Sequence, residues 1–131
     1  RSIRNIAYIS YSGFNALTPG PPGHIFRDVY NPATHLASFV SVDFDLGDMP
    51  INTIAFDDVR GDLYAGTDLG PLRLRKDMTH WEGAGSGFPE GLMVDLEIVP
   101  DQRLLVAATH GVGIYYLILP KASTSAADKR R

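Results

Sequence analysis

The sequence predicts an all-β chain, and three observations lead to that prediction. Thirteen glycines and nine prolines among 131 residues lie mostly between short apolar segments, which is the spacing of strands and tight turns. Apolar residues recur at helical spacing over no useful length, whereas several segments alternate apolar and polar residues, as Val40-Ser41-Val42-Asp43-Phe44 does. In addition, part of the chain is repeated, and both copies consist of strand-like segments.

The repeat has a constant offset of 42 residues. Ile54-Ala55-Phe56 followed by Leu63–Thr67 corresponds to Leu96-Glu97-Ile98 followed by Leu105–Thr109 (54 to 96 and 67 to 109). In each copy a polar residue and then a glycine come after the threonine. A repeat of roughly 40–50 residues made of strands is typical of propeller blades. The repeat therefore predicts the architecture, and it identifies no ligand.

Alternation and β-branched or aromatic residues predict ten strands. In chain order these are Ile6–Tyr11, His24–Tyr30, Leu36–Phe44, Ile51–Phe56, Leu63–Thr67, Pro71–Arg75, His80–Gly83, Met93–Val99, Arg103–Thr109 and Ile114–Leu119. The repeat groups them into blades at about residues 6–44, 51–87 and 93–119. The predicted fold is thus all-β, with about two and a half four-stranded β-propeller blades, a partial propeller, over residues 1–120. The alternative is a β-sandwich in which the repeat is fortuitous.

The three groups of strands differ in completeness. The first group begins at the second strand of a blade, since Ala7-Tyr8 corresponds to Leu63-Tyr64, and a longer loop, Ser12–Gly23, divides it. The middle group has four strands, and the last ends at the third strand of a blade. The small pairs Ala65-Gly66 and Ala107-Ala108 predict a close approach of neighbouring sheets.

This strand count has a consequence for partners. Propellers close with typically four to eight blades, whereas two and a half blades leave strand edges and sheet faces without neighbours. We therefore expect these surfaces to be covered by the remaining blades of a larger propeller or by further copies of the chain in a homo-oligomer.

Composition and charge argue against several classes of function. The formal net charge of −3 argues against a general nucleic-acid binder or a binder of anionic membranes, because both need a basic face. The chain has no cysteine, which excludes disulfides, thiolate zinc sites and cysteine nucleophiles, and no apolar run approaches the ~20 residues that cross a bilayer. The compartment stays open, with a secreted or periplasmic location slightly favoured. Arg1 is expected to be a cut or processed end, and Lys121–Arg131 a disordered basic tail.

A family resemblance rests on three places in the chain, namely Pro50–Ile54, Leu63–Gly70 and Trp81. There the chain resembles the Asp-box (bacterial neuraminidase repeat) β-propellers, which include sialidases, xyloglucan-hydrolysing glycosidases, sortilin-type receptors and plant photosystem assembly factors. The resemblance covers about Ile6–Pro120 and implies the C-terminal blades of such a propeller, with Trp81 packed between blades. The Asp box reads Ser/Thr-x-Asp-x-Gly-x-Thr-Trp, whereas Arg75–Trp81 lacks the glycine and is one residue shorter between aspartate and tryptophan. Function varies widely within the family.

In a propeller, the loops from second to third strands and from fourth strands to the next blade share one face, where ligands usually bind. This arrangement puts five candidate binding residues on one surface: Tyr11, Phe14, Asp48, Asp68 and His110. Aromatic rings that stack on sugars and carboxylates that accept hydroxyl hydrogens suit a carbohydrate, and a protein loop is the other expected ligand. The alternative for Asp68 and His110 is a structural role in an Asx-type turn before glycine.

One residue, Asp95, is a candidate for catalysis. It begins a repeated inner strand, where the resemblance implies an acid in related glycosidases, and two carboxylates can together hydrolyse glycosides. The corresponding residue of the middle blade is Thr53, so the acid is not part of the repeat. The candidate functions are therefore a binding or scaffolding part of a propeller, a C-terminal fragment of a secreted glycoside hydrolase, or a self-assembling structural domain.

The sequence predicts no cofactor and no metal site. Its four histidines lack zinc-site spacing. Asp43–Asp48 holds three carboxylates and is expected to be a solvated turn, with a calcium site as the alternative. Gly83–Gly87 lacks the lysine of a phosphate-binding loop. Sialidase chemistry would need clustered arginines, but the candidates are spread over predicted turns and strand faces: Arg60, Arg73, Arg75 and Arg103.

Overall fold

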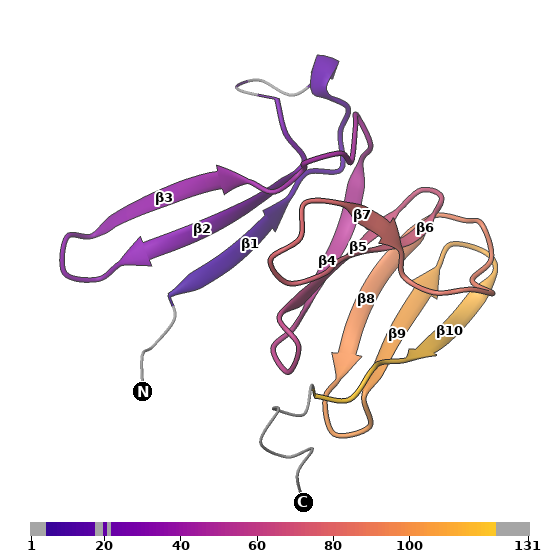
Figure 1. The fold of residues 1–131 in the computed structure, drawn as a ribbon. Coiled ribbons are helices and arrows are strands. Elements are labelled where there is room, and N and C mark those ends of the chain that lie inside the picture. Colours follow the sequence, from indigo (N-terminus) through magenta and orange to yellow (C-terminus); the bar gives the residue numbers. More distant parts are fainter. Residues whose placement is uncertain (1–4, 18–19, 21, 123–131) are drawn as a thin grey trace, which may run out of the picture.

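The computed structural model describes residues 5–17, 20 and 22–122. In this part of the chain the regular structure consists of ten strands and one short 3-10 helix, η1 (Asn15–Leu17). The strands form three small antiparallel sheets (Figure 1), so the all-β prediction is confirmed. No helix within the described ranges is long and apolar enough to cross a membrane. Most of the expected basic tail, residues 123–131, lies outside the described residues.

In each sheet the strands lie in chain order. Sheet 1 contains β1 (Ile6–Ser10), β2 (Ile25–Asn31) and β3 (Leu36–Ser41). Sheet 2 contains β4 (Ile51–Asp57), β5 (Asp62–Thr67), β6 (Gly70–Leu74) and β7 (Trp81–Gly83). Sheet 3 contains β8 (Met93–Val99), β9 (Leu104–Thr109) and β10 (Gly113–Ile118). All ten expected strands are present in the expected groups, while the identity of these sheets as propeller blades stays a prediction.

One predicted strand was too long. The third strand ends at Ser41, not at Phe44, because Asp43 turns back onto the start of β2. Its two carboxylate oxygens accept the backbone N–H groups of His24 and Ile25 at 2.7 Å each. Phe44 then has a φ of 46°, which a strand does not allow. The other strand ends differ from the expectation by at most one residue.

The 42-residue repeat is also a repeat of backbone geometry. Strand β4 pairs with β5 from Ile51 opposite Thr67, and β8 pairs with β9 from Met93 opposite Thr109. Both pairings shift register immediately after these first pairs, which is the signature of a β-bulge. The hydroxyls of Thr67 and Thr109 then donate to a glycine carbonyl beyond the turn at 2.7 and 2.6 Å. The repeated sequence therefore encodes a repeated bulge and a similar turn, which is one residue longer in the second copy.

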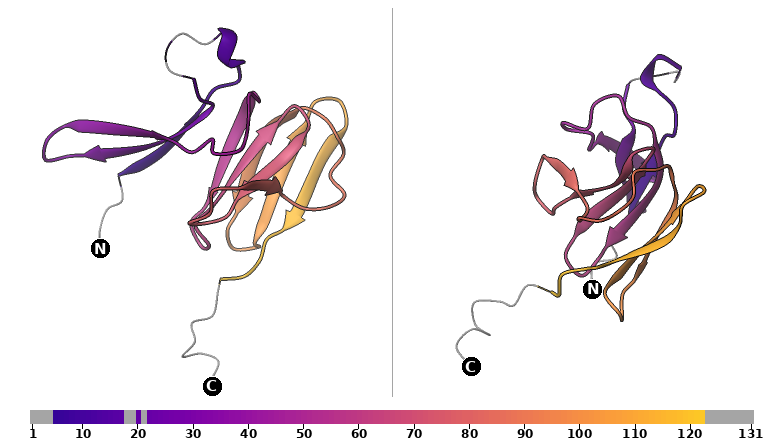
Figure 2. Two further views of the ribbon diagram at one scale, coloured as in Figure 1. Left: turned by 45° about the horizontal axis from the view of Figure 1, so that its top comes forward. Right: turned by 90° about the vertical axis from the view of Figure 1, so that its right-hand side faces the viewer.

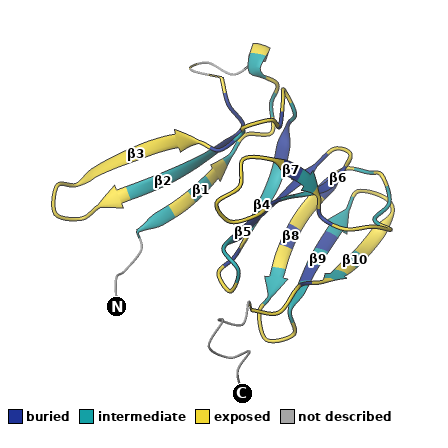
Figure 3. Ribbon diagram, in the orientation of Figure 1, coloured by how far each residue is buried: buried dark blue, intermediate teal, exposed yellow. Residues whose placement is uncertain are grey.

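Sheet 2 packs against both other sheets (Figure 2). One core cluster joins it to sheet 1 and its connection to β4, with buried members Ile25, Val42, Leu46, Ile51, Leu63, Ala65, Leu74 and Trp81. A second cluster joins it to sheet 3, with buried members Tyr64, Ala84, Met93, Leu96, Leu105, Ala107 and Leu119. Alternate residues of β5 enter the two clusters, so all six of its residues are buried (Figure 3). This pattern is that of a strand covered on both faces.

The two outer sheets have less cover. Every residue of β3 is exposed, and β10 alternates exposed with half-buried residues along most of its length (Figure 3). Such alternation indicates one face packed on a neighbour and one face open to solvent. The stack of sheets therefore ends in an open face on each side.

Trp81 ties β7 to the connection between β3 and β4. Its ring is buried, and its indole Nε1 donates to the carbonyl of Val42 at 3.1 Å. The Trp81 backbone N–H donates to Asp45 Oδ1 at 2.9 Å, and the other Asp45 oxygen contacts the ring of His80. Together these bonds, first the Trp81 amide and then His80, lower the pKa of Asp45 below its ordinary value. The expectation that Trp81 packs in the core is confirmed.

Candidate functional site

The connections β1–β2, β3–β4, β5–β6, β7–β8 and β9–β10 leave the sheets at corresponding ends. This follows from the antiparallel order of the strands, and the connections gather toward the upper side of Figure 1. We call this end the loop surface. It carries the five expected binding residues and three exposed aliphatic residues that sequence reasoning missed: Tyr11, Phe14, Asp48, Asp68, Leu69, Leu92, His110 and Val112.

Tyr11 and Phe14 provide aromatic surface on this end of sheet 1. Each exposes about half of its surface, 45% and 49%. The Tyr11 N–H donates to the His24 carbonyl at 2.9 Å, and its carbonyl accepts the Ile51 N–H at 3.0 Å. The Tyr11 ring also packs edge-on against Phe26, with 6.0 Å between ring centroids. Tyr11 is thus held by both sheet 1 and the start of sheet 2.

The buried His24 lies beneath Asp48 of the loop surface. Its Nδ1 is 3.1 Å from Asp43 Oδ2, and its Nε2 is 3.1 Å from Asp48 Oδ1 without the alignment of a hydrogen bond. The same Asp48 oxygen accepts the backbone N–H of Asn15 at 2.9 Å. Asp48 therefore anchors the β1–β2 connection over a buried imidazole. Sequence reasoning missed this role of His24, because Asp43 lies 19 residues away in the sequence and no local pattern joins the two.

Asp68 lies in the β5–β6 turn and does not close it. The side-chain oxygen that accepts the N–H of Leu69 belongs to Thr67, at 3.0 Å. Asp68 instead accepts the Asn52 side-chain amide at 2.8 Å, across to the start of β4. The expected alternative, an Asx-type turn made by Asp68, is therefore wrong. The neighbouring Leu69 is 67% exposed, so an apolar side chain forms the tip of this turn.

His110 lies at the equivalent turn of sheet 3. Its backbone N–H donates to the carbonyl of Leu92 at 2.9 Å, which fixes the β7–β8 connection beside the β9–β10 turn. Leu92 and the turn residue Val112 are both exposed. Each of the three sheets thus presents at least one exposed apolar residue at this end.

Asp95 lies just after the bulge of β8. Its Oδ1 accepts the hydroxyl of Thr53 at 3.2 Å and the backbone N–H of Leu96 at 2.9 Å. Asp48 and Asp68 bond to other groups. The structure therefore joins none of these acids to another through a shared contact, and it gives Asp95 a role in connecting sheets 2 and 3.

The three carboxylates between Asp43 and Asp48 diverge. Asp43 bonds to the start of β2, Asp45 to the start of β7, and Asp48 to the β1–β2 connection. Within the described ranges no group of three or more histidine or acidic side chains is arranged to hold a metal ion. Asp45 and Asp48 are exposed, as the predicted solvated turn requires, and the three carboxylates in addition bond to three different elements.

A cleft of about 280 Å³ separates sheets 1 and 2 at the end away from the loop surface. Tyr8 and Phe56 line it and stack on each other, with 5.3 Å between ring centroids. Arg27 and Lys76 lie at its margin. It marks the place where sheet 1 diverges from sheet 2.

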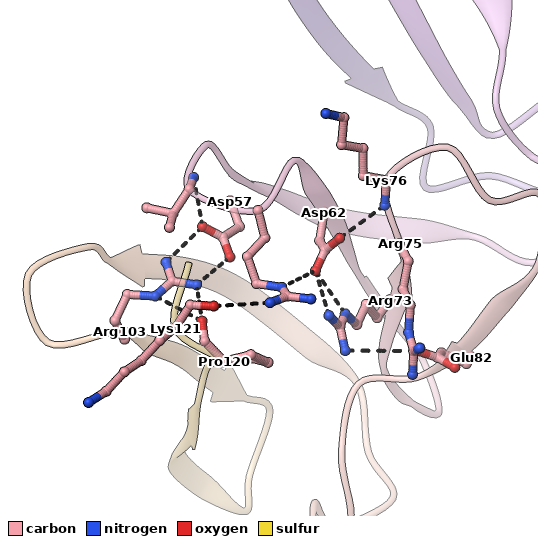
Figure 4. A network of polar contacts seen from close by, with 11 residues as sticks. Asp57, Asp62, Arg73, Arg75, Lys76, Glu82, Arg103, Pro120 and Lys121 are labelled. Atoms are coloured by element: carbon pink, nitrogen blue, oxygen red, sulfur yellow. Dashed lines mark hydrogen bonds and ion pairs between the residues drawn. The ribbon is translucent and has the colours of Figure 1, made fainter. Parts of the chain in front are cut away.

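Charged side chains form a network at the same end of sheets 2 and 3 (Figure 4). Arg103 makes a two-pronged contact with the fully buried Asp57, at 2.8 and 2.7 Å, and also donates to the Pro120 carbonyl. Burial alone would raise the pKa of Asp57, but the Arg103 guanidinium outweighs it and holds that pKa below its ordinary value. Asp62 accepts Arg73 at 2.5 Å. The network fastens the β4–β5 turn to the chain that leaves β10.

These contacts bear on the arginines considered for sialidase chemistry. Arg73 and Arg103 hold buried aspartates, Arg75 contacts Glu82 at 2.6 Å, and Arg60 donates to the Lys121 carbonyl. They form a structural network away from the loop surface (Figure 4).

The chain matches no family model, no curated protein and no solved structure.

Proposed function

We propose that this chain is a binding and scaffolding part of an Asp-box-like β-propeller, whose loop surface holds a protein segment. The observation that carries this proposal is the row of exposed apolar side chains at one end of consecutive sheets, from Phe14 through Leu69 to Val112. Exposed apolar groups rimmed by polar residues are typical of interaction sites. A rigid sheet scaffold with loops at one end is a common platform for binding.

Two features support the propeller part of the proposal. The three sheets follow one another with the same strand order, and β4 lies beside β8 at repeat-equivalent positions. The chain also ends each hairpin of the repeat with the same threonine-to-glycine bond. Side-by-side sheets of this kind are what propeller blades require.

The chemistry of the loop surface favours a protein ligand over a carbohydrate. Sugar sites depend on aromatic faces and on free polar groups, whereas Leu69, Leu92 and Val112 are aliphatic. The polar groups of Asp48 and Asp68 already bond within the protein. Apolar side chains at the centre with polar groups around them are the usual composition of a protein interface.

The proposal is tested by selecting a displayed library of random disulfide-cyclised peptides against the purified chain. The selected peptides should lose binding to the variants Leu69→Lys and Phe14→Ala, and keep binding to Met78→Lys. Met78 is also exposed and apolar, but it lies in the β6–β7 turn, away from the loop surface. Failure to select any peptide sensitive to Leu69→Lys would contradict the proposal.

A parallel measurement covers the carbohydrate alternative. Calorimetric titration with xyloglucan, β-glucan and sialoside oligosaccharides should give no heat of binding. Binding that disappears in Tyr11→Ala or Asp68→Ala would instead assign the surface to sugars, as the sequence first suggested.

A further inference from the structure

Sheet 3 has an open face along its last strand, β10. In β10, Leu117 packs into the core cluster shared with sheet 2, and Tyr115 lies 6.4 Å from the ring of Phe88. The alternate residues Ile114, Tyr116 and Ile118 point the other way and are 75%, 69% and 72% exposed. We call these three residues, with their β9 partners Ala108, Val106 and Leu104, the C-terminal end face.

Sheet 1 has a corresponding open face. Tyr8 faces sheet 2, since its ring stacks on Phe56, so the neighbouring strand positions face away. These include Ile9, Phe26, Tyr30 and Phe39, of which all but Phe26 are exposed. The half-buried Asp28 lies on the same side, directly opposite Phe39. We call the four apolar residues together with Asp28 the N-terminal end face. It lies at the opposite side of the stack from the C-terminal end face (Figure 2).

The repeat indicates that such a face is normally covered. Val106 on the C-terminal end face corresponds to Tyr64 of sheet 2 at the 42-residue offset. Tyr64 is only 1% exposed, because sheet 3 packs over it. On sheet 3 the equivalent face exposes Tyr116, Ile114 and Ile118 to solvent. On sheet 2 this face is covered by sheet 3, which is another sheet of the same kind.

The areas fit an association between copies. Taking about 150–250 Å² for a fully covered large side chain, the three β10 residues expose roughly 400 Å². The aromatic and aliphatic residues of the N-terminal end face present a similar apolar area. Two such faces together offer roughly 800 Å² of apolar side-chain surface, so the residues around them have to supply the rest of the roughly 1,200–2,000 Å² of total buried surface found in stable complexes.

We infer that copies of this chain associate head to tail, with the C-terminal end face of one copy packed on the N-terminal end face of the next. The two faces differ in sequence, so the contact is heterologous and continues until a ring closes or a filament grows. The occupant is a second copy, because it brings a three-stranded sheet with a matching apolar face. This inference does not depend on what the loop surface binds.

The experiment measures mass by light scattering after size exclusion, over a range of concentrations, for the whole chain and two variants. Tyr116→Lys and Phe39→Glu each place a charge on one end face, and the glutamate cannot pair with Asp28, which lies opposite position 39. The wild-type chain should form oligomers, and each variant alone should run as a monomer of 14.3 kDa. Circular dichroism and Trp81 emission should be unchanged, because both side chains are exposed.

Mixing the two variants gives the decisive result. Each variant keeps one intact face, and the intact faces are opposite, so the mixture should form a one-to-one dimer. Leu69→Lys, on the loop surface, should assemble like the wild type and lose only peptide binding. A wild-type chain that stays monomeric at every concentration would overturn the inference. Normal assembly of Phe39→Glu would overturn it too, since like faces would then be in contact.

Discussion

The hydroxyl of Thr53 lies 3.2 Å from Asp95 Oδ1, and these two residues are 42 positions apart. They are therefore equivalent residues of two successive repeats, in contact with each other. Each lies just after the bulge of its strand, Thr53 in β4 and Asp95 in β8. The Leu96 N–H approaches the same hydroxyl at 3.2 Å. The repeats are thus placed so that the inner strands of neighbouring sheets meet at corresponding points.

The first prediction concerns the energy of this contact. Replacing Thr53→Val or Asp95→Ala should each lower the free energy of unfolding by only about 1 kcal/mol, because the bond is exposed. In a double-mutant cycle measured by urea unfolding, the coupling between the two sites should be clearly positive and no greater than about 1 kcal/mol. Additive effects would mean that the contact carries no energy.

A second substitution of Asp95 separates binding from catalysis. Asp95→Asn keeps the shape of the side chain, so binding of selected peptides to the loop surface should not change. If the chain, or a longer protein that contains it, hydrolyses xyloglucan, β-glucan or sialosides and Asp95→Asn abolishes that activity, the glycoside hydrolase hypothesis replaces the proposed binding function.

The sequence predicted the sheets because the relevant signal is local. Alternation from Ile51 to Phe56 and the recurrence of the Leu63–Thr67 pattern at Leu105–Thr109 were enough to place and group the strands. The hydrogen bonds of Asp43 and Asp45 could not be predicted, because they join segments far apart in the sequence. Asp43 bonds to Ile25, which is 18 residues away, and Asp45 bonds to Trp81, which is 36 residues away.

The strand order could be predicted, and with it the connections on which Tyr11, Asp68 and His110 lie. Their role in binding stays a prediction. The bond of Asp68 to Asn52 depends on pairing across the hairpin, which a local turn rule does not include. Leu69 was missed because a single apolar residue in a turn is common and carries no signal by itself.

The second prediction concerns Arg103. Asp57 is fully buried and Arg103 is its charged partner, so Arg103→Met leaves an unpaired carboxylate in the core. We expect a loss of about 3–5 kcal/mol in the free energy of unfolding. Arg75→Met is the matched control, because the Arg75–Glu82 pair is exposed and should contribute at most about 1 kcal/mol.

Arg103→Met should also change how the stability of the protein depends on pH. In the wild type the pKa of Asp57 is lowered in the folded state, so its stabilising contribution is complete above the unfolded pKa of about 3.9. That contribution is lost as the pH falls through the folded value. In Arg103→Met the guanidinium is lost while burial and the backbone bonds from Val59 and Arg60 remain. The pKa of Asp57 should therefore rise, and acid should stabilise the variant relative to the wild type. Melting temperatures from pH 2 to 7 measure the difference, and parallel curves would contradict it.

The third prediction concerns Gly66, where sheets 2 and 3 approach most closely around β5. A Cβ at this position would lie 2.5 Å from Thr53 Cγ2 and 2.8 Å from Met93 Cβ. Met93 is fully buried and cannot move aside easily. Gly66→Ala should therefore destabilise the fold by about 1–3 kcal/mol. The close approach that the small pair Ala65-Gly66 predicted is confirmed at this residue.

Two further variants show whether the crowding at Gly66 is the cause. Gly83→Ala is the control, because the nearest atom to its added Cβ is 4.0 Å away. This substitution lowers the conformational entropy of the unfolded chain and should stabilise the fold by about 0.4–1 kcal/mol. Thr53→Ser removes the Cγ2 methyl and keeps the hydroxyl that bonds Asp95, so in the Gly66→Ala background it should restore part of the lost stability. Chemical denaturation of the three variants measures this. If Gly66→Ala proved as stable as Gly83→Ala, the sheets would have to stand further apart in solution, and the covered face of sheet 2 that motivates the head-to-tail contact would lose its support.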